Sequence, residues 1–152
     1  EPDFVEAFLA LPASEVDEQL FGLLAELLET ALAEHPEYAD LHSSQARVLE
    51  RLGRFDQAEA HARRAVQINP RYLAARLHLA RLCERLGRTD EALTHLRRVL
   101  AGGGDWPDVH CLAGRLLKHR RDTADARRHL KRALELNPNY CEAADELESL
   151  AA

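Results

Sequence analysis

The sequence predicts an all-α fold in which antiparallel helix hairpins stack into a solenoid. Residues 51–70 (RLGRFDQAEAHARRAVQINP), 85–104 (RLGRTDEALTHLRRVLAGGG) and 119–138 (HRRDTADARRHLKRALELNP) repeat one pattern every 34 residues. Apolar residues recur at helical spacing within each copy, and Gly or Pro residues separate the helical stretches. A fixed period of this length is typical of repeat proteins, in which each unit buries its apolar face against its neighbours.

The 152 residues are expected to form one solenoid domain. It would consist of an N-terminal helical hairpin or degenerate repeat (1–38), three repeats (39–72, 73–106 and 107–140) and a C-terminal capping helix (141–152). The three repeats follow one another without insertion or deletion. Positions within a repeat are counted here from Ala39, Leu73 and Pro107 as position 1.

The N-terminal segment reads as two helices, a short one within DFVEAFLAL (3–11) and a longer one from about Glu15 to Glu34, with Ser14 and Asp17 around its start. The longer helix has an apolar stripe of Leu20, Leu23, Leu24, Leu27, Leu28, Ala31 and Leu32. This hairpin would either cap the solenoid, which needs a covered end, or pair two chains.

Each repeat reads as two helices joined by a tight turn. The first helix of repeat 1 has its apolar stripe at Leu41, Gln45, Val48, Leu49 and Leu52. Gly53 and Gly87 are expected to end these first helices, because Gly tolerates a left-handed C-cap, whereas the third repeat has Arg121 there. The second helices are expected to be capped by Asp56, Asp90 and Asp122.

The second helices should end at Asn69–Pro70 in repeat 1 and at Gly102–Gly104 in repeat 2. Small residues at positions 8, 20 and 27 would let the helices approach closely. They are Ala46, Ala80 and Gly114, then Ala58, Ala92 and Ala126, then Ala65, Val99 and Ala133. We therefore expect these residues to lie in the core.

These positions resemble the tetratricopeptide repeat family over residues 39–140. The family's usual aromatic residue at position 4 is replaced by His42, Arg76 and His110. The resemblance implies a right-handed superhelix whose concave groove is lined by positions 2, 5, 6, 9, 12 and 13 of the first helices. It also implies binding of protein segments rather than catalysis.

Carried onto this chain, the family's groove positions present a double row of mostly basic residues, with Leu77 and His78 at positions 5 and 6 of repeat 2. Position 9 holds Arg47, Arg81 and Arg115, position 13 holds Arg51, Arg85 and His119, and position 12 holds Glu50, Glu84 and Lys118. Arg binds carboxylates through two parallel hydrogen bonds, so the expected partner is an acidic peptide or protein segment. The alternative is that these arginines pair with neighbouring glutamates on a solvated face. The family's clamp for chaperone C-terminal tails is not matched.

The charges are unevenly distributed along the chain. Residues 1–46 contain eleven acidic residues and no Lys or Arg, whereas residues 47–141 hold all 20 basic residues. An acidic N-terminal segment could therefore occupy the basic groove of its own chain or of a neighbour. The simpler interpretation of this segment is a capping hairpin.

No enzymatic or cofactor motif is present: the sequence lacks GxxxxGK[ST], HExxH and GxSxG. Cys83, Cys111 and Cys141 are odd in number and lack CxxC spacing, which argues against disulfides and a zinc site and favours apolar packing in the cytoplasm. A periplasmic location stays open, because a chain without Met is expected to be a fragment.

The position-23 histidines (His61, His95 and His129) would lie ~8–10 Å apart on stacked helices, too far to share one ion. A partly exposed ladder is expected instead.

Nucleic acid is an unfavoured partner, although Arg63–Arg64, Arg97–Arg98 and Lys131–Arg132 form a second basic ladder. Aromatic residues are only 5% of the chain, the net charge is −6, and packing at repeat junctions accounts for Tyr38, Tyr72, Trp106 and Tyr140.

No membrane span is expected. The sequence thus predicts a non-catalytic interaction scaffold. The alternatives are self-association through the Leu-rich N-terminal helix and a regulatory appendage of a larger enzyme.

Overall fold

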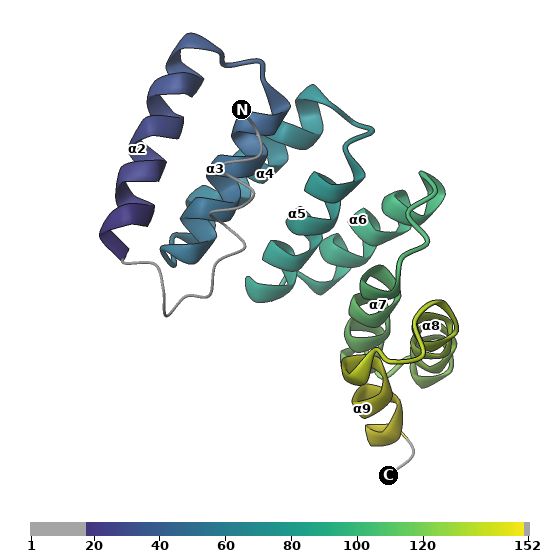
Figure 1. The fold of residues 1–152 in the computed structure, drawn as a ribbon. Helices are drawn as coiled ribbons and strands as arrows, with labels where there is room; N and C mark the ends of the chain where they lie inside the picture. The colour runs from purple at the N-terminus through teal and green to yellow at the C-terminus, as the bar shows by residue number, and fades with distance from the viewer. Residues whose placement is uncertain (1–17, 151–152) are drawn as a thin grey trace. The chain divides into compact units, whose positions relative to one another are not determined.

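A computed structural model describes residues 18–150, and in this range the chain forms helices and no strand. The helices are α2 (Glu18–Glu34), α3 (Ala39–Arg51), α4 (Phe55–Ile68), α5 (Leu73–Arg85), α6 (Thr89–Ala101), α7 (Pro107–His119), α8 (Thr123–Leu136) and α9 (Cys141–Ser149) (Figure 1). The predicted all-α helical repeat solenoid is confirmed. The predicted helix within 3–11 and the residues Ser14 and Asp17 lie outside the described range.

The chain divides into two compact units, one up to Ala75 and the other from Arg76. In the first unit α2 packs on α3, and α3 packs on α4. In the second unit α7 packs on α6, α8 and α9. None of the described helices is both long and apolar enough to cross a membrane.

The predicted apolar stripe of α2 is only partly covered. Phe21, Leu24, Ala25 and Leu28 are buried in one cluster with Val48 of α3. Leu20, Leu23 and Leu27 of the stripe are instead 48%, 57% and 67% exposed. The reason is that α2 is apolar around most of its circumference, while α3 covers only one side of it.

The small residues predicted to lie in the core are buried. The alanines at positions 8, 20 and 27 have no measurable exposure, and Val99 takes the same place in repeat 2. Gly114 of α7 allows a particularly close approach, since a Cβ atom there would lie 2.6 Å from Cγ of Leu130 on α8. The small side chains thus set the spacing between the helices of a hairpin.

The turn between the two helices of each repeat has one conformation in all three copies. Gly53 and Gly87 have φ angles of 71° and 74°, and Arg121 has φ 64°. The following backbone N–H donates to the same relative carbonyl each time, from Arg54 to Leu49 and from Asp122 to Leu117 at 2.9 and 3.0 Å. The third repeat therefore keeps the turn without the glycine that would favour it.

The predicted helix caps were right at one position in three. Asp122 caps α8, and its side chain accepts a hydrogen bond from the backbone N–H of Asp125 at 3.4 Å. Asp56 and Asp90 were wrong, because α4 and α6 begin after Arg54 and Arg88 and these aspartates lie in the first turn. There they are still favourable, since a carboxylate complements the positive end of the helix dipole.

Helix α9 covers the apolar end of the second unit. Ala143 is buried against Leu130, Ala133 and Cys111, and Leu147 packs beside it. Cys83 and Cys111 are buried as predicted, but Cys141 at the start of α9 is exposed rather than packed. Tyr38 was expected to pack at a repeat junction, but it is 57% exposed, so more than half of its surface remains in contact with solvent.

Candidate functional site

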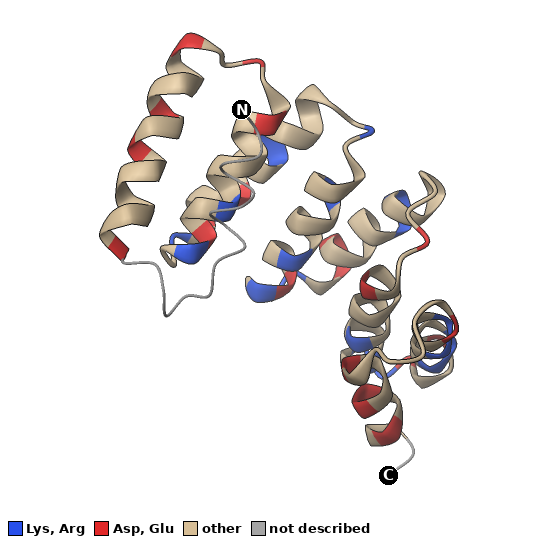
Figure 2. Ribbon diagram, in the orientation of Figure 1, with Lys and Arg blue, Asp and Glu red and all other residues tan. Residues whose placement is uncertain are grey.

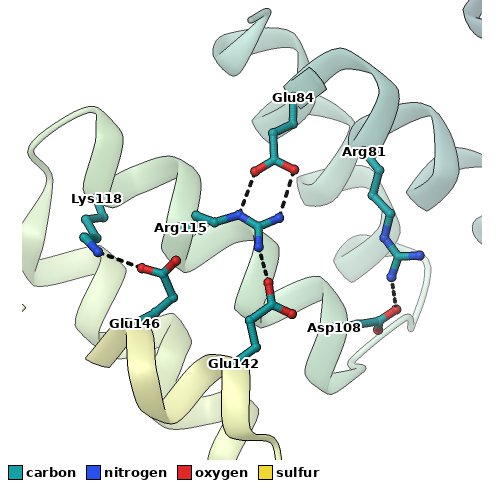
Figure 3. A network of polar contacts seen from close by, with 7 residues as sticks. All are labelled: Arg81, Glu84, Asp108, Arg115, Lys118, Glu142 and Glu146. Atoms are coloured by element: carbon teal, nitrogen blue, oxygen red, sulfur yellow. Dashed lines mark hydrogen bonds and ion pairs between the residues drawn. The ribbon is translucent and has the colours of Figure 1, made fainter. Parts of the chain in front are cut away.

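The candidate site is a row of charged side chains on α5, α7 and α9, all within the unit that begins at Arg76 (Figure 3). We call it the ion-pair row. It consists of Arg81, Glu84, Asp108, Arg115, Lys118, Glu142 and Glu146. Its three cations, Arg81, Arg115 and Lys118, are among the groove residues that the resemblance implied.

Arg115 lies at the centre of the row and contacts two carboxylates. Its Nε and Nη2 donate to Oε1 and Oε2 of Glu84 on α5 at 2.7 and 2.9 Å, and its Nη1 donates to Glu142 on α9. The paired hydrogen bonds with Glu84 raise the pKa of Arg115, although partial burial opposes this effect. The guanidinium group therefore ties α7 to a helix on either side of it.

The other two cations of the row each bind a carboxylate from the helix after the next one, α5 to α7 and α7 to α9. Arg81 donates to Asp108 at 2.6 Å, and Lys118 donates to Glu146 at 2.7 Å and to the hydroxyl of Ser149 at 2.6 Å. These side chains remain partly exposed, with Arg81 at 48% and Lys118 at 33%. The ion-pair row is thus a surface of half-exposed charges rather than a buried network.

The pairing follows the repeat register. An arginine at position 9 meets an acidic residue at position 2 of the following repeat, 27 residues later, in both Arg81–Asp108 and Arg115–Glu142. The equivalent of these acids after Arg47 is Ala74, which has no carboxylate. The sequence reasoning found the cations but missed their partners, although the recurring 27-residue separation was readable.

The remaining predicted groove residues are distributed over both units. In the first unit Arg47 is half-buried, and the guanidinium of Arg51 lies 5.2 Å from the ring centroid of Phe21. In the second unit Arg85 and His119 are exposed, whereas Leu77 is only 5% exposed and belongs to the core. His78 is half-buried. The first and last described helices, α2 and α9, carry acids and no Lys or Arg (Figure 2).

Two histidine pairs form a second recurring feature that sequence reasoning missed. His42 and His61 lie with their Nδ1 atoms 3.0 Å apart, and His110 and His129 lie 2.8 Å apart in the same way. The position-4 histidines thus meet the position-23 histidines of their own hairpins. Repeat 2 has no such pair because Arg76 occupies its position 4, and His95 is 9% exposed rather than part of an exposed ladder.

The hydrogen bonds around these pairs fix which nitrogen carries the proton. Nε2 of His42 lies 3.1 Å from the carbonyl oxygen of Pro36, which can only accept, so the Nδ1 of His42 accepts from His61. Nε2 of His110 lies 2.7 Å from the carboxylate of Asp105. Hydrogen bonds from Arg132 and His110 lower the pKa of Asp105, so this carboxylate also accepts.

Among the described residues, one group of side chains could hold a metal ion. Its potential ligand atoms are those of Cys83 on α5 and of Glu91 and His95 on α6, and they all lie within 4.8 Å of one another. These residues lie on two helices of one hairpin and have no recognisable ligand spacing along the sequence, so the group is apparent only in the folded chain.

Family comparisons agree with the repeat register. Three tetratricopeptide repeat profiles match residues 25–72, 51–116 and 107–140, and together they span residues 25–140. No curated protein is significantly similar in sequence to the chain.

Several solved structures share the fold. They include YrrB, described as a TPR protein with an unusual peptide-binding site (23% identity, TM-score 0.79, 86% of this chain and 67% of that one). TTC0263, a thermophilic TPR protein of Thermus thermophilus, is 22% identical with a TM-score of 0.72 (88% and 74%). The first TPR of Spaghetti (RPAP3), bound to the HSP90 peptide SRMEEVD, is 19% identical with a TM-score of 0.72 (74% and 90%). The matched profiles, the 34-residue period and the helix hairpins lead to one conclusion: the chain belongs to the tetratricopeptide repeat family.

Proposed function

We propose that the chain is a non-catalytic protein–protein interaction scaffold that binds an acidic, extended or helical segment of a partner along α5, α7 and α9. The observation that carries this proposal is the ion-pair row itself. Arg81, Arg115 and Lys118 each bind a carboxylate that another helix presents at the surface. A partner's carboxylates would take these same places.

The row is accessible enough for such an exchange. The Arg115 side chain is 28% exposed and its partner Glu142 is 51% exposed. Exposed ion pairs contribute only about 0–1 kcal/mol each, so a partner that offers several carboxylates can displace the more exposed internal ones, such as Glu142, at little cost. The hydrocarbon stems of the same arginines would add apolar contact.

Peptide binding by proteins of the same fold supports this proposal. YrrB is described as having a peptide-binding site, and the Spaghetti domain is bound to a peptide, SRMEEVD, that contains three acidic residues. We propose that Arg85, His119 and His78 extend the surface of the second unit, and that Arg47 and Arg51 serve the same purpose on α3.

A peptide display screen at low and high salt tests the proposal. Acidic peptides should bind, and their affinity should fall as salt rises, because the contacts are charge pairs near the surface. Replacing Arg47, Arg81 and Arg115 together by Ala should weaken binding about tenfold or more. The matched control replaces Arg63, Arg97 and Lys131, which removes the same charge from position 25 of the second helices. Equal loss in both variants would overturn the proposed surface.

A second comparison separates specific exchange from general attraction. Changing Glu142 and Glu146 to Gln removes the competing carboxylates of α9, leaves Glu84 and Asp108 in place, and should raise the affinity for acidic peptides several-fold. Changing Asp145 and Glu148, also on α9, to Gln removes the same charge without touching Arg115 or Lys118. An unchanged affinity in the first variant would contradict the exchange.

Self-association through α2 is a second candidate function. It is favoured by Leu20, Leu23 and Leu27, which are 48%, 57% and 67% exposed. Contiguous exposed leucines on a helix favour contact with another apolar surface. A mass that rises with concentration, and returns to the monomer value when Leu23 and Leu27 are changed to Ser, would support it. A monomer at every concentration would exclude it.

A further inference from the structure

The hairpin of α5 and α6 carries a further group of polar side chains, none of which belongs to the ion-pair row. Cys83 on α5 is fully buried, and it lies beside His95 and Glu91, which follow each other by one turn of α6. His95 Nε2 lies 3.8 Å from Oε1 of Glu91. The three side chains thus bring one sulfur, one nitrogen and one oxygen atom to a single place.

These atoms match the ligands and nearly match the spacing of a zinc site. Zinc binds Cys sulfur, His nitrogen and carboxylate oxygen at about 2.0–2.3 Å in tetrahedral geometry, which sets the ligands about 3.3–3.6 Å apart. The present atoms lie within 4.8 Å of one another. Side-chain rotations that bring these atoms about one ångström closer together would give this spacing, and a water molecule can complete the fourth position.

The other two repeats show that packing does not require this combination. Position 11 holds Cys83 in repeat 2 but Leu49 and Leu117 in repeats 1 and 3. His61 and His129, the equivalents of His95, are engaged by the histidines at position 4. Of the three repeats, only repeat 2 has an arginine rather than a histidine at position 4 and a cysteine rather than a leucine at position 11.

The position also allows an ion to enter and remain. His95 is 11% exposed at its side chain and Cys83 is buried, so the nitrogen and sulfur ligands lie in a largely dry environment. The Glu91 side chain is 33% exposed and provides the solvent side. Zinc requires the thiolate, so binding would release the thiol proton and become tighter as the pH rises.

We propose that Cys83, Glu91 and His95 form a binding site for a single zinc ion that ties α5 to α6. The site supplies three protein ligands from one hairpin and holds the second repeat together. It does not depend on the peptide-binding proposal, because none of its ligands belongs to the ion-pair row.

The test uses the chain stripped of metal with a chelator and then titrated with Co²⁺ and Zn²⁺ alone. One equivalent of Co²⁺ should give a thiolate-to-cobalt charge-transfer band, and Zn²⁺ should remove it. Zinc at a hundredfold excess over its dissociation constant should raise the Tm by about 5–10 °C. No band with the unaltered chain would overturn the proposal.

The variants identify the ligands. The band and the Tm shift should disappear in Cys83→Ser and His95→Gln, and the affinity should fall tenfold or more in Glu91→Gln. Cys111→Ser, Cys141→Ser and His129→Gln are the matched controls and should keep both signals. A band that survives Cys83→Ser, or that vanishes in Cys141→Ser, would place the metal elsewhere.

Circular dichroism of each variant shows whether it is folded. If Cys83→Ser unfolds, Cys83→Leu restores the residue found at this position in the other repeats and still removes the thiol. A folded Cys83→Leu chain that keeps the zinc-dependent rise in Tm would overturn the proposal, and one that loses it would support it. Glu91→Gln changes a partly exposed residue, so the chain should stay folded, and the expected tenfold loss of zinc affinity in this variant is an independent test of the site.

Discussion

Arg121 has the same left-handed backbone conformation as Gly87, with φ angles of 64° and 74° at the same position of successive repeats. The two residues have the same role in the turn, since each is followed by the same backbone hydrogen bond. The left-handed conformation is less favourable for Arg121 than for Gly87, because the Cβ atom of a non-glycine residue comes too close to the backbone there, at a cost of about 1–2 kcal/mol. The third turn is therefore held in place by its neighbours.

Replacing Arg121 by Gly should stabilise the chain by about 0.5–1 kcal/mol, because relief of the strain exceeds the added entropy of the unfolded chain. Urea unfolding measures the change. The reciprocal change, Gly87→Ala, should destabilise by about 1 kcal/mol, since no atom lies within 4 Å of the added Cβ and only the backbone conformation opposes it. A loss of stability in Arg121→Gly would contradict the interpretation.

Two glycines in helices should respond to alanine in opposite directions. Gly114→Ala should destabilise by about 1–3 kcal/mol, because the new Cβ would lie 2.6 Å from Cγ and 2.8 Å from Cδ2 of Leu130. Gly22→Ala on α2 should stabilise by up to about 1 kcal/mol, because nothing lies within 4 Å and alanine favours the helix. Thermal unfolding of both variants checks the pair. Similar effects at the two sites would show that packing at Gly114 is not limiting.

The histidine pairs should make the stability depend on pH. Burial, followed by the neighbouring His42 or His110, lowers the pKa of His61 and His129 below 6.5 in the folded chain. As the pH falls, these two histidines are therefore protonated in the unfolded chain at a higher pH than in the folded chain. This contribution to stability is present in full above pH 6.5 and is lost as the pH falls through the lowered folded-state pKa.

We expect the Tm to fall between pH 7 and pH 5, and to fall less in a His61→Gln, His129→Gln double variant. Glu29 near His61, and Asp125 and Arg128 near His129, stay in place in that comparison. An equal decrease in both proteins would assign the pH dependence to other groups.

The three cysteines should differ in reactivity. Burial, and then the nearby Glu142, raise the pKa of Cys111 to about 12, which lowers its thiolate fraction about a thousandfold relative to an ordinary thiol. Cys141 is exposed, and Cys83 is buried. Iodoacetamide should therefore add one group to the native chain, at Cys141, and three in denaturant. Mass spectrometry of peptides identifies the labelled cysteine, and labelling of Cys111 in the native chain would contradict the prediction.

The period of the sequence predicted the helices, their order and the buried alanines, because each depends on local spacing. It could not resolve features that need two helices in place. The pairing of Arg81 with Asp108 depends on how one repeat follows the next, and the division of α2 into covered and exposed sides depends on where α3 lies. The group of Cys83, Glu91 and His95 likewise exists only once α5 and α6 are folded against each other.

The position of α9 has a consequence for any acidic ligand. Glu142 and Glu146 belong to the same folded chain as Arg115 and Lys118, so a ligand's carboxylate has to compete with an intramolecular contact. A ligand with a single carboxylate cannot compete with this tethered pair, whereas one that presents several carboxylates at helical spacing gains from each exchange. The acidic residues of α9 would therefore act as a threshold that selects for charge density in the partner.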